Sequence, residues 1–219
     1  MKIILFGASG MVGQGVLREC LLDEGVDGVL AVGRAPLGRQ HAKLQEVVLA
    51  DLTDYSAVEE RLRGYDACFF CLGVSAAGMS EADYRRVTYD VTLAAAGTLA
   101  RLDPGMTFIY VSGAGTDSTE SGRTMWARVK GATENALLRL PFKAACMFRP
   151  GLIQPRHGER SKTRFYRVFY TLLGPLIPVL SAALPGQVTT TERIARAMLK
   201  VARQGAAKTV LETADINSI

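Results

Sequence analysis

The sequence predicts a doubly wound α/β fold, in which a parallel sheet carries helices on both faces. Six short apolar runs, rich in β-branched and aromatic residues, alternate with segments whose apolar residues recur at helical spacing. The runs are almost continuously hydrophobic, which is typical of strands buried on both faces of a sheet. A glycine-rich turn directly follows the first run and opens the first helical segment. Together these features indicate βαβ crossovers of the Rossmann type.

The elements follow in order along the chain. Strands are predicted at 3–6, 28–33, 46–50, 67–72, 107–112 and 143–148. Helices are predicted at 11–22, 55–63, 82–102, 123–140 and 192–203. No linker or low-complexity tract divides the chain convincingly, so we expect one domain over residues 1–219. Residues 151–219 are expected to form a small C-terminal elaboration of that domain.

Composition favours a small anionic ligand at least as much as a nucleic acid. The chain holds 26 Lys and Arg against 21 Asp and Glu, a formal net charge of +5. The excess is mild and mostly scattered, so we expect a small-molecule substrate and no nucleic-acid partner. The opening MKIILFGASG runs from a strand straight into glycines and has no signal-peptide pattern, so we expect a cytoplasmic protein.

The four cysteines lie inside apolar segments, which indicates buried thiols in a reducing compartment. Cys68 and Cys71 form a C-x-x-C pair within a predicted strand. Residues three apart in a strand point to opposite faces of the sheet, so this pair is poorly placed for a shared metal or a redox couple. We therefore expect no metal site.

The segment from Gly7 to Gly13 has the spacing G-x-x-G-x-x-G between the first strand and the first helix. Glycines there allow a tight turn and the close approach of a pyrophosphate, while the helix N-terminus offers N–H groups and a positive dipole. The motif therefore predicts a dinucleotide site. Its candidate residues are Gly7, Ser9, Gly10, Met11, Val12 and Gly13.

The end of the second predicted strand favours NADP over NAD. A site that prefers NAD places a carboxylate there, about 20 residues after the glycines, on the adenosine ribose. This chain has Gly33 and Arg34 instead, and a guanidinium pairs well with a 2′-phosphate. A solvated surface arginine is the alternative interpretation. Further cofactor contacts are expected after the third and fourth strands, from Asp51, Leu52, Cys71, Leu72 and Gly73.

These motifs occur with Ser112 after the fifth strand, the run VKGATE at 129–134 and the run FRPG at 148–151. The combination resembles the short-chain dehydrogenase/reductase superfamily. Within it, the sequence is most similar to the atypical, NAD-dependent epimerase/dehydratase-like branch that includes the HTATIP2/TIP30-type oxidoreductases. The resemblance covers residues 1 to about 155 and adds Pro150 to the expected cofactor-binding residues.

The resemblance also implies the catalytic residues. Ser112 is expected to orient the substrate and Lys130 to hold the nicotinamide ribose, while a tyrosine four residues before the lysine moves the proton. Trp126 stands at that tyrosine's position and cannot exchange a proton, and Thr88 stands where relatives often have an asparagine. Trp126 either lines the nicotinamide or substrate pocket or packs in the core. Alternative proton donors are Tyr84, Tyr89, Tyr110, Tyr166 and Tyr170, or Ser112 as a relay from water.

The stretch 162–184 changes from a basic piece to an apolar one, 171–184, that Gly and Pro interrupt. The apolar piece is too short and broken to span a membrane. It fits an apolar lid over a substrate site, a weak peripheral contact with an anionic membrane, or core packing with a solvated basic face. The resemblance favours the lid, and hence an apolar substrate of modest size. A monomer and a homodimer both fit the sequence.

Three functions fit these observations. The first is an NADP-dependent oxidoreductase that acts on a small apolar carbonyl or alcohol. The second is an NADP-binding regulator or redox sensor without turnover, because Trp126 replaces the catalytic tyrosine. The third is an interaction protein whose bound nucleotide is structural. The fold alone does not decide among them.

Overall fold

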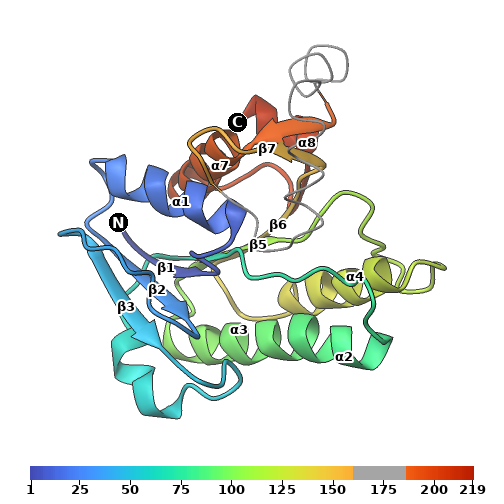
Figure 1. The fold of residues 1–219 in the computed structure, drawn as a ribbon, viewed down its shortest axis with the longest axis horizontal. Helices are drawn as coiled ribbons and strands as arrows, with labels where there is room; N and C mark the ends of the chain where they lie inside the picture. Colours follow the sequence, from blue (N-terminus) through green and yellow to red (C-terminus); the bar gives the residue numbers. More distant parts are fainter. Residues whose placement is uncertain (160–185) are drawn as a thin grey trace.

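The computed structural model describes residues 1–159 and 186–219 and has a seven-stranded, all-parallel central sheet (Figure 1). The spatial order of the strands is β3-β2-β1-β4-β5-β6-β9. Their bounds are Lys2–Phe6 for β1, Gly28–Gly33 for β2, Leu44–Val48 for β3, Ala67–Phe70 for β4, Thr107–Val111 for β5, Ala144–Arg149 for β6 and Val210–Glu212 for β9. The chain reverses its direction of winding between β1 and β4, as in a doubly wound sheet, and this confirms the predicted fold.

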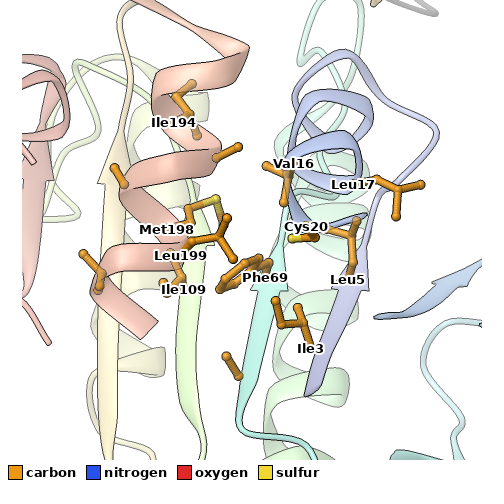
Figure 2. Close-up of a cluster of buried hydrophobic side chains, with 14 of the residues drawn as sticks. Ile3, Leu5, Val16, Leu17, Cys20, Phe69, Ile109, Ile194, Met198 and Leu199 are labelled. Carbon is orange, nitrogen blue, oxygen red and sulfur yellow. The ribbon is translucent and has the colours of Figure 1, made fainter. Parts of the chain in front are cut away.

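Helices cover both faces of the sheet (Figure 1). On one face lie α1, Met11–Leu22, and α7, Thr191–Gln204. On the other lie α3, Val91–Leu102, and α4, Met125–Leu137. Figure 2 shows the core between α1, α7 and the sheet, to which Ile3, Leu5, Val16, Leu17, Cys20, Phe69, Ile109, Ile194, Met198 and Leu199 contribute. The near-continuous hydrophobic strands thus have a packed layer on each side.

Two of the predicted helices are not regular α-helices over their whole length. The segment at 55–63 forms a 3₁₀-helix, η1, at Ser56–Leu62. The long segment at 82–102 contains α2, Glu81–Arg85, then a π-helical turn, η2, at Arg86–Asp90, and then α3. Apolar residues spaced three and four positions apart do not distinguish an α-helix from a 3₁₀-helix or a π-helical turn. Over a few turns, each of these helices keeps one face apolar.

Several short elements were not predicted. They are β7, Leu152–Gln154, β8, Val188–Thr190, β9 and the helix α8, Thr213–Ser218. β7 pairs with β8 in a separate two-stranded parallel sheet. Three residues carry too little periodicity to identify a strand from sequence. The stretch 162–184 and its tyrosines, Tyr166 and Tyr170, lie outside the described residues.

The C-x-x-C pair is split between the two faces of the sheet, as predicted. Cys68 belongs to the core on the α3 side, whereas Cys71 packs against the core on the α1 and α7 side. All four cysteines are free thiols. In the part of the chain that the structure describes, no group of His, Cys, Asp and Glu is suited to holding a metal. None of its helices has the length and hydropathy required to cross a membrane.

Candidate functional site

The glycine turn is pressed between the end of β4 and the start of α1. Gly7 has φ +78°, and a Cβ on it would lie 2.6 Å from the backbone of Cys71 and Leu72. A Cβ on Gly13 would lie 2.0 Å from the carbonyl oxygen of Gly7. The Gly10 N–H donates to the same oxygen at 2.9 Å and closes the turn. Glycine is therefore required at positions 7 and 13 by close backbone contact, as the motif predicts.

The N-terminus of α1 has the features of an anion-binding site. Its N-cap, Gly10, is extended and provides no side-chain cap, and the first turn contains no acidic residue. The Gln14 amide donates to the Ser9 carbonyl at 3.0 Å and fixes the loop without covering the helix end. Ser9, Gly10, Met11 and Val12 are half-buried, so their backbone remains partly accessible. This end of the helix lies at the topological switch point between β1 and β4, where a dinucleotide pyrophosphate fits.

The residues expected around the adenosine have different exposures. Arg34 is exposed just after β2. Asp51 accepts hydrogen bonds from the N–H and hydroxyl of Thr53, at 2.8 and 2.7 Å, and these bonds lower the pKa of its carboxyl. Leu52 is buried in the core on the α3 side. Of the three, Arg34 and Asp51 are exposed enough to contact a ligand directly.

The residues after β4 and β6 line the same carboxyl edge of the sheet. Cys71 and Leu72 are half-buried behind Gly7, and Gly73 is exposed with open space around it. Pro150 is buried, and its carbonyl oxygen accepts from the Ala114 N–H at 2.9 Å. Pro150 thus anchors the loop that follows β5. A groove of about 500 Å³ between α1 and α7 contains none of the predicted site residues.

The structure brings Ser112 and Lys130 together. The Lys130 ammonium donates to the backbone carbonyl of Ser112 at 2.9 Å and lies 5.7 Å from the centre of the Tyr110 ring. Burial lowers the pKa of Lys130 to about 8, and the negative charge of Glu134 partly opposes this shift. At neutral pH Lys130 is therefore mostly protonated, but it is close to its titration midpoint.

The Ser112 side chain is held by a carboxylate that was not predicted. Its hydroxyl donates to Glu134 Oε1 at 2.5 Å. Glu134 is 1% exposed and is paired with Arg149, which is 9% exposed and is the last residue of β6. The Arg149 side chain also bonds to Ser118 and Glu212. The only sequence signal for Glu134 is its position one helical turn after Lys130, which puts both side chains on one side of α4.

Trp126 is half-buried one turn before Lys130. Its ring lies against the loop after β5, because a Cβ on Gly115 would lie 3.5 Å from the ring atom Cη2. Gly115 has φ +84°, which favours glycine there independently of the ring. The indole therefore packs against this loop, at the same carboxyl edge of the sheet as Lys130.

Of the alternative tyrosines, the three that belong to the described residues, Tyr84, Tyr89 and Tyr110, are not placed as ready proton donors. Tyr84 and Tyr110 are each 1% exposed, and burial raises the pKa of Tyr110. The Tyr89 ring is covered by the Arg85 guanidinium, 4.0 Å above its centre. Thr88 lies in the π-helical turn with its hydroxyl buried and without a hydrogen-bond partner.

Comparison with known proteins assigns the family. Residues 7–139, more than half of the chain, match the family model described as NAD(P)H-binding. The chain belongs to the NAD(P)H-binding family. Among relatives of this chain, the protein fmp52-2 of Aspergillus oryzae, named as mitochondrial, is 28% identical over 97% of this chain and 93% of its own length. HTATIP2 of Rattus norvegicus is 27% identical over 75% of this chain and 70% of its own.

A solved structure agrees with the fold of this NAD(P)H-binding chain. The dTDP-glucose 4,6-dehydratase DesIV from Streptomyces venezuelae, with NAD and TYD bound, aligns with a TM-score of 0.68 at 17% identity. The alignment covers 96% of this chain and 74% of that one. The family model and HTATIP2 confirm the predicted resemblance to NAD(P)-binding proteins of this type, and the dehydratase shows that the chain shares the fold of the epimerase/dehydratase branch.

The predicted cytoplasmic location is wrong. The fungal relatives of this NAD(P)H-binding chain are named as mitochondrial proteins. The prediction was based on the lack of a secretory signal pattern, and this lack does not distinguish the cytoplasm from mitochondria.

Proposed function

We propose that the protein is an NADP(H)-dependent oxidoreductase that acts on a small apolar carbonyl or alcohol. The observation that supports it is the arrangement of the carboxyl edge of the sheet. The glycine turn and the uncapped start of α1 lie after β1, and Lys130 is fixed to Ser112 directly after β5. A dinucleotide with its pyrophosphate on α1 extends along this edge from Arg34 towards Lys130. When bound, its nicotinamide supplies a hydride.

The preference for NADP depends on Arg34. Its side chain is exposed beside the half-buried Gly33. A guanidinium in this position can bind a 2′-phosphate through two parallel hydrogen bonds, whereas NAD leaves it without a ligand. The carboxylate on the adjacent strand β3, that of Glu46, accepts a hydrogen bond from the Leu37 N–H at 2.8 Å. This bond holds Glu46 against the loop between β2 and β3.

Calorimetric titration with NADPH and with NADH tests this proposal. We expect NADPH to bind more tightly, and Arg34→Ala to weaken NADPH binding by roughly tenfold or more while leaving NADH almost unchanged, because only the phosphate contact is lost. Arg39→Ala, which removes an exposed arginine from the same loop, is the matched control. Binding of neither nucleotide would exclude an oxidoreductase function.

The alternative is an NADP(H)-binding regulator or sensor without turnover. Trp126, which cannot exchange a proton, is the observation that favours it. The two functions differ in a simple assay, in which purified protein and NADPH are mixed with hexanal or benzaldehyde as apolar carbonyl probes. Oxidation of NADPH that depends on the probe supports the oxidoreductase, and tight binding without oxidation supports the regulator.

The names of the fungal relatives support a mitochondrial location for this chain as well. Fractionation of cells that express the full chain with a C-terminal tag tests this. Recovery of the tag with the mitochondrial fraction is the expected result, and recovery in the cytosolic fraction alone would contradict it.

A further inference from the structure

The side chain of Ser112 is already committed as a hydrogen-bond donor. Glu134 is paired with Arg149, whose Nε lies 3.1 Å from each carboxylate oxygen. A carboxylate paired in this way is ionised and only accepts hydrogen bonds. The proton between Ser112 and Glu134 therefore belongs to the serine hydroxyl, which points it at Glu134. Ser112 has lone pairs left for a ligand, but no proton to donate to a carbonyl oxygen.

Within residues 1–159 and 186–219, Trp126 and Tyr110 are not able to exchange protons at neutral pH either. Trp126 has no titratable group. Tyr110, on β5, is buried beside Tyr84, and burial raises the pKa of its phenol. Lys130 differs, because it is half-buried, and its ammonium keeps two N–H bonds beyond the one it gives to the Ser112 carbonyl.

We propose that Lys130 itself is the proton donor and acceptor of this oxidoreductase, held in place by the backbone carbonyl of Ser112. The inference depends on the proposed function. In reduction, the carbonyl carbon accepts the hydride, and the π electron pair of the C=O bond moves to the oxygen. This oxygen then takes one proton from the Lys130 ammonium. The substrate is reduced to an alcohol and NADPH is oxidised to NADP⁺. The neutral amine then regains its proton from solvent, and oxidation follows the same steps in reverse.

The charges around Lys130 suit this role. Among the residues that the structure describes, the titratable groups that face it are Glu134, one turn along α4, and Tyr110 on β5. Glu134 stabilises the ammonium but is itself neutralised by Arg149, so its effect is limited. Burial is the larger effect and brings the pKa of Lys130 to about 8. A proton donor is most effective when its pKa is close to the working pH.

Lys130→Arg separates proton transfer from binding. Arginine keeps the positive charge and the N–H donors but does not lose a proton in the working range. With NADPH and hexanal, we expect kcat to fall by roughly 100-fold or more, because a general acid contributes about 10²–10⁴-fold. The Kd for NADPH, measured by calorimetry, should change far less than kcat. Ser112→Ala, which retains the backbone carbonyl, should lower kcat less than Lys130→Arg does.

A labelling experiment gives a result that does not depend on turnover. The free protein is treated with trace acetic anhydride from pH 6 to 11, and acetylation of Lys130 is quantified by peptide mass spectrometry, with the exposed Lys143 as internal standard. We expect the reactivity of Lys130 to rise with a midpoint near pH 8. A midpoint near the ordinary lysine value, or a kcat that Lys130→Arg leaves intact, would overturn the inference while the proposed function stands. A wild-type protein that binds NADPH but reduces neither probe would overturn both.

Discussion

The Arg149 guanidinium donates through Nε to both carboxylate oxygens of Glu134, at 3.1 Å each, and this buried pair joins the end of β6 to α4. Through Ser112 it also reaches the end of β5, and through Glu212 the end of β9. The ends of three adjacent strands thus share one polar network at the carboxyl edge. Removal of one partner leaves the other charge buried and uncompensated.

Arg149→Met should therefore lower the free energy of unfolding by about 3–5 kcal/mol, as measured by urea denaturation. The double variant Glu134→Leu with Arg149→Met removes both charges and should recover much of this loss. The control is Arg203→Met, which breaks the more exposed pair with Asp23 and should cost at most about 1 kcal/mol. Equal losses for the two arginines would show that the buried network is not a major contributor to stability.

Gly13→Ala tests the close packing of the glycine turn. The added Cβ would lie 2.0 Å from the Gly7 carbonyl oxygen, so the turn and α1 must separate. We expect lower thermal stability and loss of measurable NADPH binding by calorimetry. Gly97→Ala is the matched control, since its Cβ in α3 meets nothing within 4 Å, and it should stabilise the protein by roughly 0.5–1 kcal/mol. Normal NADPH affinity in Gly13→Ala would contradict the assignment of the turn as the pyrophosphate site.

The sequence predicted strands β1 to β6 and the glycine turn because these depend on local patterns. Continuous apolar runs identify strands that are buried on both faces, and the spacing of Gly7, Gly10 and Gly13 reflects one turn and one helix start. Ser112 directly follows β5, so its place at the carboxyl edge follows from the parallel sheet, whereas Lys130 on α4 was expected there only from the resemblance to the short-chain dehydrogenase/reductase superfamily. In a parallel sheet, every strand ends at the same edge.

The sequence did not predict the role of Glu134, because that role depends on tertiary contacts. Its partner Arg149 is 15 residues away on β6, and a carboxylate on a helix is usually solvated. The hydrogen bond from the Ser112 hydroxyl to Glu134 depends on this ion pair, so the sequence does not predict it either. The short strands β7, β8 and β9 were missed because three residues show no clear period.

Three of the four cysteines should be unreactive in the native protein. Burial raises the pKa of Cys20, Cys68 and Cys71, so very little thiolate is present at neutral pH. We expect iodoacetamide at pH 7.5 to label these three residues only after unfolding in urea, as followed by peptide mass spectrometry. Rapid labelling of Cys71, which is half-buried beside the glycine turn, would instead favour a thiol-based redox sensor.

The stability of the protein should also report the burial of Lys130. Its pKa is about 8 in the folded chain and 10.5 as an ordinary lysine. Between these values the unfolded chain holds the proton and the folded chain does not, so the Lys130 contribution to stability rises as pH increases. Below pH 8 both states are protonated, and the folded state carries the full cost of the buried charge.

Other groups titrate in the same range, so the comparison is made with Lys130→Met. Burial raises the pKa values of Tyr110 and Cys68, which lowers the stability of both proteins as pH rises above about 9. These contributions cancel in the difference between the two proteins. We expect the free energy of unfolding of the wild type, minus that of Lys130→Met, to increase from pH 8 to pH 10.5, by up to about 1.4 kcal/mol per pH unit. A difference that stays constant over this range in urea denaturation would mean that Lys130 keeps an ordinary pKa, and it could not then serve as the proton donor near neutral pH.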